Sequence, residues 1–151
     1  MNKRRVVVTG LGLVTPVGIG VNESWKNIIE GQSGISDITH FDTNGFATPF
    51  SSTIAGEVKN FDPLDIMDRK EARKMDPFSA YALATTQEAI LDSKLDLEKV
   101  NLDRAGVVWG SGIGGMYTFQ EECFNFKDGD GTPRFNPFFV PKMIVDIAAG
   151  H

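Results

Sequence analysis

The chain has 151 residues, of which 41% are hydrophobic and 23% charged, and this composition is ordinary for a soluble globular protein of one domain. Its formal net charge of −5 disfavours bulk binding to nucleic acid, and no apolar run approaches the length of a membrane span. One cysteine excludes an internal disulfide, which fits a reducing compartment, and with two histidines it argues against a structural zinc site. The apolar run near the N-terminus is too short for a signal peptide, so we expect a cytoplasmic protein. No cofactor is expected.

The N-terminal region is predicted to hold a strand, a glycine-rich loop and a helix. Residues 3–9 are rich in β-branched side chains, which predicts a buried strand, and residues 10–20 are predicted to form a loop. Asn22 is predicted to cap a helix that reaches about Glu30, with Gly31 at its C-terminal stop. Three large apolar side chains of this helix are spaced three and four apart and should face the core: Trp25, Ile28 and Ile29.

The middle of the chain is predicted to contain a second, longer helix. Residues 32–52 look irregular and polar, and residues 53–58 are a candidate for a short strand. Asp76 and Pro77 form a typical helix start, and the helix is predicted to run to about Ser93. Small and apolar side chains occur on nearly all of its faces, which predicts burial on more than one side.

The last third alternates between predicted strand and helix. Residues 105–109 are predicted to be a strand, residues 116–127 a helix and residues 127–133 a turn-rich loop. Residues 137–150 should end in a helix, with Pro141 near its first turn. This alternation predicts an α/β fold with a mainly parallel sheet.

One glycine motif formally matches a dinucleotide-binding fingerprint. Gly110, Gly112 and Gly115 fit G-x-G-x-x-G after a predicted strand. The acids at the required distance, Asp128 and Asp130, lie in a KDGDG turn that no apolar strand precedes. The pattern therefore favours glycines that allow close backbone approach over a nucleotide site, and the same holds for TGLGLVTP near the N-terminus.

Cys123 is predicted to be a buried or half-buried thiol rather than a nucleophile. It lies in mid-helix beside Glu121 and Glu122, whose charges oppose thiolate formation. His40 is predicted to lie in a loop, and KDGDG to be a surface turn, because KDGDG lacks the repeated ligands of a calcium loop.

Four cations in DRKEARKMD stand out in an acidic chain. They occupy positions i, i+1, i+4 and i+5, which places them on adjoining stripes of a helix: Arg69, Lys70, Arg73 and Lys74. Two interpretations stay open. The cations either form a solvated face paired with Asp68, Glu71 and Asp76, or they form a docking patch for an acidic partner.

Taken together, RRVVVTGLGLVTPVG, DRKEARKMDPF, GSGIGG and NPFFVPKMIVDIAAGH resemble the β-ketoacyl-acyl-carrier-protein synthases. The resemblance is nearest to the type II elongation enzymes of bacterial fatty-acid synthesis and covers essentially the whole chain. It implies a thiolase-like α/β fold with a layered mixed sheet and buried helices. Residues 1–151 would form an incomplete N-terminal half, a synthase domain that ends before the nucleophile.

The resemblance also implies site residues. It assigns docking of the strongly acidic acyl carrier protein to Arg69, Lys70, Arg73, Lys74 and Arg134. Family members often carry a further basic residue where Phe135 stands here, so that part of the surface is expected to be weaker. The resemblance assigns the acyl pocket to Gly112, Ile113 and Phe139, with Ile113 as the gate for chain length.

The implied activity is decarboxylative Claisen condensation of an acyl-enzyme with malonyl-acyl-carrier protein, catalysed by a homodimeric acyltransferase. The family's cysteine nucleophile and two histidines would follow His151, and neither Cys123 nor His40 matches them. We therefore expect no catalytic residue in this chain and no activity of the chain alone. The alternative is a non-catalytic subunit, like a chain-length factor, that binds the carrier protein or an acyl chain.

Overall fold

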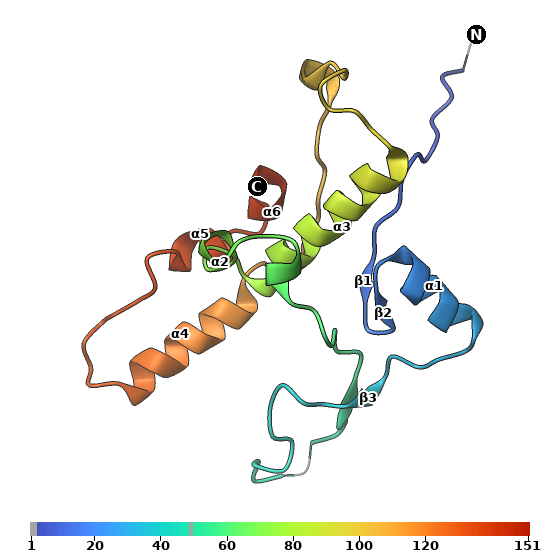
Figure 1. The fold of residues 1–151 in the computed structure, drawn as a ribbon. Coiled ribbons are helices and arrows are strands. Elements are labelled where there is room, and N and C mark those ends of the chain that lie inside the picture. Colours follow the sequence, from blue (N-terminus) through green and yellow to red (C-terminus); the bar gives the residue numbers. More distant parts are fainter. Residues whose placement is uncertain (1–2, 49) are drawn as a thin grey trace.

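The longest helix of the chain, α3 (Pro77–Ser93), lies at the centre of the computed structural model, which describes residues 3–48 and 50–151 (Figure 1). The predicted start is confirmed: the Asp76 side chain accepts a hydrogen bond from the Phe78 N–H, and Pro77 occupies the first turn. Lys94 ends the helix in a left-handed conformation, with φ of 54°.

A short hairpin and a helix precede α3. Strands β1 (Val14–Thr15) and β2 (Gly18–Ile19) pair antiparallel and lead into α1 (Val21–Ile29). The predicted helix is confirmed, but the predicted cap is wrong, because Gly20 with φ of 90° takes the N-cap position in place of Asn22. At the N-terminal end of α1, the Val21 N–H has no acceptor within the helix. It donates instead to the carboxylate of Glu88, a residue of α3 far away in the sequence.

The expected inward face of α1 is turned outward. The Ser24 hydroxyl donates to the Gly18 carbonyl over 3.0 Å, and the Asn27 amide donates to the Val17 carbonyl over 2.6 Å. These bonds fix the polar face of α1 on the hairpin. The opposite, apolar face is therefore exposed, and the prediction that it faces the core is wrong for Trp25, Ile28 and Ile29.

Between α1 and α3 the chain forms a second hairpin and two short helices. Strand β3 (Ser36–Asp37) pairs antiparallel with β4 (Ile54–Ala55). The strand predicted over 53–58 is thus present but shorter, and β3 lies in the segment predicted to be irregular. The 3-10 helix η1 (Pro63–Asp65) and the helix α2 (Arg69–Ala72) then lead towards α3.

The C-terminal part consists of short helices and one longer helix. The 3-10 helix η2 (Leu102–Arg104) precedes α4 (Met116–Asp128), which confirms the helix predicted there. The helix predicted at the end of the chain is divided into α5 (Phe139–Met143) and α6 (Ile147–Gly150), because the backbone is extended at Ile144, with ψ of 123°. α5 contacts α4, and α6 contacts α3.

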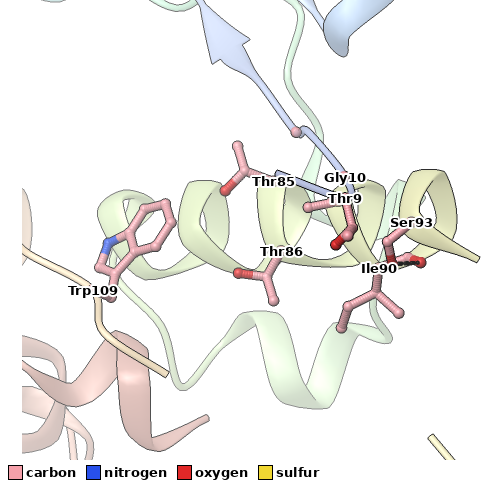
Figure 2. Close-up of a pocket in the computed structure, with 9 residues that line it drawn as sticks. Thr9, Gly10, Thr85, Thr86, Ile90, Ser93 and Trp109 are labelled. Atoms are coloured by element: carbon pink, nitrogen blue, oxygen red, sulfur yellow. Dashed lines mark hydrogen bonds between the residues drawn. The ribbon is translucent and has the colours of Figure 1, made fainter. Parts of the chain in front are cut away.

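The predicted mainly parallel sheet is absent from the part of the chain that the structure describes. The strands there form only the two antiparallel hairpins, β1–β2 and β3–β4, and residues 3–9 and 105–109 join neither. Val6 is 92% exposed and Val108 is 99% exposed. The two segments instead border one hollow of about 300 Å³ on α3, through Thr9 and Trp109 (Figure 2). They are not paired with each other, so neither has the ladder of hydrogen bonds that a strand needs.

The glycines near the N-terminus bring that segment directly onto α3. A Cβ on Gly12 would collide with the carbonyl oxygen of Thr85, and one on Gly10 would collide with that of Ala89. This supports close backbone approach as the reason for these glycines.

Carboxylates on α3 and its cap hold three other segments in place. Asp76, which is 3% exposed, also accepts the Thr118 N–H of α4 over 2.8 Å. Glu88 accepts the Leu13 N–H over 2.9 Å and the Val21 N–H over 2.7 Å. One turn further along α3, Asp92 accepts a backbone N–H of the N-terminal segment over 2.9 Å. Side-chain acceptors on one helix thus replace part of the hydrogen bonding that a sheet would supply.

The buried core is small. The accessible surface is 11753 Å², whereas a compact monomer of this mass exposes about 7,500 Å². The buried hydrophobic side chains among the described residues are Met75, Ala80, Ala82 and Ala148. The expected burial of α3 therefore holds only near its N-terminal end, since Leu91 is 70% exposed. No helix in the described part of the chain is long and apolar enough to cross a membrane.

Replacing Asp76 by Ala should lower stability by about 1–3 kcal/mol, because it removes a helix cap and leaves the buried Thr118 N–H without its acceptor. Thermal unfolding and amide hydrogen exchange at Thr118 would measure the loss. Asp103→Ala, at an exposed acid, is the control and should leave both unchanged. Equal stability of the two variants would contradict the assigned role.

Candidate functional site

Basic side chains from separate parts of the sequence meet at one pocket. The pocket has a volume of about 520 Å³, and its lining includes Arg73 at the end of α2, Arg134 and Lys142 of α5. The buried carboxylate of Glu122, on α4, lies in the same lining. The structure thus brings together Arg73 and Arg134, which were predicted as site residues, and adds Lys142, which was not.

The start of α2 determines how its cations are presented. Asp68 caps the helix and accepts the N–H groups of Lys70 and Glu71 over 2.7 and 2.9 Å. Arg69 and Lys70 are exposed on this short helix, and Arg73 follows at its C-cap. The predicted cluster is therefore helical only in its first half.

The interpretation of these cations as a self-paired face holds for one of them. Lys74 pairs with Glu71 over 2.6 Å. Asp68 is engaged by backbone N–H groups of α2, and Asp76 is buried against α3 and α4. Within residues 3–48 and 50–151, no carboxylate lies within 4.0 Å of a side-chain nitrogen of three of the cluster's members: Arg69, Lys70 and Arg73.

The loop after α4 is held in place by a carboxylate. Glu122 accepts the Asn136 N–H over 3.0 Å, and this bond fixes the loop beside α4. Phe135 stacks between Phe126 and Phe139, with ring centroids 5.7 and 5.5 Å apart. Arg134 lies 3.5 Å from an acid of the KDGDG turn, and both of these side chains are exposed.

The charge of the pocket favours an anion. Three cations and one carboxylate line it, and Glu122 already accepts a backbone hydrogen bond. Arginine presents a planar fork that matches carboxylate and phosphate oxygens, and lysine adds a compact charge. The arrangement can therefore bind acidic groups of a partner.

Sequence reasoning missed Lys142 because it stands alone in the apolar segment NPFFVPKMIVDIAAGH. No local spacing connects it to the cluster on α2. The one signal available was a single cation within a mostly apolar run, which indicates that the side chain reaches a polar surface.

The three predicted acyl-pocket residues do not form a closed pocket in this structure. Ile113 is 66% exposed, and a Cβ on Gly112 would meet no atom within 4 Å. Phe139 is half-buried in the aromatic stack with Phe135 and Phe119. An apolar cavity of about 440 Å³ lies on α3, and none of the three predicted residues lines it.

The N-terminus of α4 already binds an anionic group of the chain itself. Asp76 accepts the Thr118 N–H, at the position where a pyrophosphate would be bound. A Cβ on Gly115 would collide with the carbonyl oxygen of Lys142, and one on Gly114 would come within 2.6 Å of that of Met143. These two glycines therefore serve close approach to α5, which supports the prediction for Gly115. An added Cβ on Gly110 or Gly112 would meet no atom within 4 Å, so the structure shows no close backbone approach at these two positions.

The predicted burial of the single cysteine is wrong. Cys123 is exposed on α4, since the preceding position, Glu122, takes the buried side of the helix.

The family model described as the N-terminal domain of β-ketoacyl synthase matches residues 3–151. The chain belongs to the β-ketoacyl synthase family. It is 46% identical over 147 residues to 3-oxoacyl-[acyl-carrier-protein] synthase 2 of Staphylococcus aureus strain COL, covering 97% of this chain and 34% of that protein. It is 47% identical over 151 residues to the protein of the same name from Vibrio harveyi, covering 100% and 35%. The chain thus spans about a third of the length of these curated relatives.

Solved structures of ketosynthases share the fold, which is α/β and thiolase-like. The ishigamide ketosynthase/chain length factor aligns with a TM-score of 0.76 at 26% identity, covering 96% of this chain and 35% of that one. A β-ketoacyl synthase from Burkholderia phymatum STM815 aligns with a TM-score of 0.76 at 23% identity, covering 98% and 36%. A type II PKS ketosynthase in complex with its acyl-carrier protein aligns with a TM-score of 0.72 at 24% identity, covering 95% and 37%.

One strongly perturbed carboxylate lies away from the basic pocket. Glu57 is 7% exposed and accepts hydrogen bonds from the Thr39 hydroxyl, the Thr39 N–H and the His40 N–H. The bond from the Thr39 hydroxyl is the main cause that lowers the pKa of Glu57 to about 2. Glu57 therefore acts as a structural acceptor that holds the loop after β3, where His40 lies as predicted.

Glu57→Gln should lower the melting temperature above pH 4.5, because the ionised carboxylate is the better acceptor of these bonds. The folded-state pKa is depressed from 4.5 to about 2, so the stabilisation is fully present above pH 4.5 and is lost as the pH falls through about 2. The difference in Tm between wild type and variant should therefore narrow towards pH 2. Glu98→Gln, at an exposed acid, is the control. A difference that does not change with pH would contradict this role.

Proposed function

We propose that this chain provides the N-terminal domain of a condensing enzyme, a 3-oxoacyl-[acyl-carrier-protein] synthase of fatty-acid biosynthesis. The observation that carries the proposal is the identity of 46–47% over nearly the whole chain with curated synthases of that name. Within the proposed enzyme, which is a cytoplasmic homodimer, residues 1–151 form the synthase domain that precedes the nucleophile.

The reaction is a decarboxylative Claisen condensation. An acyl group is held on the enzyme as a thioester, and the malonyl thioester on the carrier protein loses carbon dioxide. The carbanion that remains attacks the acyl carbonyl, a carbon–carbon bond forms, and the enzyme thiolate leaves. No residue of this chain takes a catalytic role in the proposal. The chain contributes positioning, which lowers the barrier by holding the two thioesters in reacting geometry.

Docking of the acyl carrier protein is assigned to the basic site, defined as Arg69, Lys70, Arg73, Lys74 and Arg134. Its support is the shared pocket of Arg73 and Arg134 and the absence of nearby carboxylates around three of the cations on α2, among the described residues. A positive patch on an otherwise acidic chain accelerates encounter with an acidic partner and orients it.

Charge reversal at Lys70, Arg73 and Lys74 should weaken binding of acyl carrier protein by at least about tenfold, and the loss should shrink at high salt. Titration calorimetry on the protein expressed from its complete reading frame would measure it. Lys26→Glu, at an exposed lysine of α1, is the matched control. An unchanged affinity in the triple variant would leave only a solvated basic face.

The acyl pocket is assigned to Gly112, Ile113 and Phe139. Ile113 stands between two glycines in an exposed loop, and Gly114 has φ of 81°. Such a loop leaves room beside Ile113 for an acyl chain, and the isoleucine side chain would set how far that chain enters.

Ile113→Phe should reduce acylation by long acyl chains and leave short chains unaffected, because the larger ring fills the space that the chain requires. Acylation of the complete enzyme by a series of acyl thioesters, followed by mass spectrometry, would measure the cut-off. Val108→Phe, on a side chain that is 99% exposed, is the control for added bulk. Undiminished acylation by long chains would exclude Ile113 as the gate.

A second candidate is a non-catalytic subunit that resembles a chain-length factor. The observation that favours it is the similarity to a structure whose name pairs a ketosynthase with a chain length factor. Condensation of acyl and malonyl thioesters by the purified protein alone would exclude this candidate, whereas carrier binding without condensation would favour it.

A further inference from the structure

We propose that Lys142 is a further docking residue, which binds a carboxylate of the acidic partner in the pocket that it shares with Arg73 and Arg134. The inference rests on the proposed docking function and extends it to a residue outside the basic site.

The backbone of Lys142 is held firmly in position. Its N–H donates to the Phe138 carbonyl over 2.9 Å, and its own carbonyl packs against Gly115 so closely that a Cβ there would collide. The side chain is half-buried and lies in the lining of the pocket. A half-buried lysine on a fixed backbone loses less conformational freedom on binding than a lysine in a mobile surface segment.

The charges in the pocket leave an excess of positive charge. Glu122 is the carboxylate of the lining, and its Oε2 accepts the Asn136 N–H over 3.0 Å. In the part of the chain that the structure describes, no carboxylate lies within 4.0 Å of a side-chain nitrogen of Arg73 or Lys142. A bound carboxylate would pair with both cations in this open, solvent-accessible hollow.

The carboxylate is assigned to a protein partner, because Arg73 belongs both to the pocket and to the exposed end of α2. A partner that covers the cations of α2 therefore also covers the mouth of the pocket. The neighbouring position that could carry a cation, Phe135, instead has its ring in the aromatic stack with Phe126 and Phe139. Lys142 supplies the positive charge on that side of the pocket.

The test compares Lys142→Glu, Lys142→Gln and Lys142→Arg in the protein expressed from its complete reading frame. Affinity is measured for acyl carrier protein with and without its phosphopantetheine arm. We expect about five- to tenfold weaker binding for the Glu variant, a smaller loss for the Gln variant and affinity within about twofold for the Arg variant. Acylation by a carrier-free thioester should stay unchanged, and Lys26→Glu serves as the matched control.

The outcomes separate the inference from the proposed function. Unchanged affinity in Lys142→Glu, together with weaker binding after charge reversal on α2, would overturn the role of Lys142 and leave docking intact. Unchanged affinity in Lys142→Glu and in the charge-reversal variant of α2 would overturn both the role of Lys142 and the proposed docking function. A loss seen only with the phosphopantetheine-bearing carrier would show a phosphate in the pocket and overturn the carboxylate. Thermal unfolding of each variant monitors folding, and the neutral Gln variant keeps the test valid if Lys142→Glu is unstable.

Discussion

Hydrogen bonds from backbone N–H groups to carboxylates of α3 are the interaction on which the arrangement of this chain depends. Asp76, Glu88 and Asp92 each accept an N–H from a segment distant in sequence, at 2.7–2.9 Å. A charged acceptor makes a stronger hydrogen bond than a neutral one, and a buried N–H without an acceptor is costly. With a core as small as this one, these contacts set where the N-terminal segment, α1 and α4 lie relative to α3.

The same kind of contact builds the basic pocket. Asp76 joins the start of α3 to the start of α4. Arg73, the C-cap of α2, precedes Asp76 by three residues and lines the same pocket as Glu122 of α4. On α4, Glu122 holds the loop through the Asn136 N–H, and this places Arg134 across from Arg73. Two buried carboxylates thus bring together cations that no local pattern connects. Both carboxylates accept backbone hydrogen bonds, and among the described residues neither Arg73 nor Lys142 has a carboxylate within 4.0 Å of its side-chain nitrogens, whereas Arg134 pairs with Asp130.

The positions of the main helices could be predicted from neighbouring residues. The strands could not, because a strand depends on a partner strand that is distant in sequence. The Asp76–Pro77 start of α3 needs only neighbouring residues, and so does the cluster on α2. Residues 3–9 and 105–109 have strand composition, but a strand exists only when another strand satisfies its backbone. Likewise Gly20 is the N-cap of α1, and the acceptor for the Val21 N–H is Glu88, far along the chain, so local spacing wrongly pointed to Asn22. Lys142 could be assigned to the candidate site only from the structure, because it is close to Arg73 and Arg134 in space and not in sequence.

The basic pocket and the exposed apolar face of α1 would bind different kinds of partner surface. Trp25 and Ile29 are exposed on α1, and neighbouring exposed apolar side chains are typical of surfaces that bind another protein. The cations, by contrast, lie around a pocket whose geometry is set by Asp76 and Glu122. Docking through cations loses strength as salt rises, whereas burial of an apolar face does not weaken in that way. Carrier docking should therefore weaken as ionic strength rises while apolar assembly does not, which makes the two contributions separable in one binding experiment.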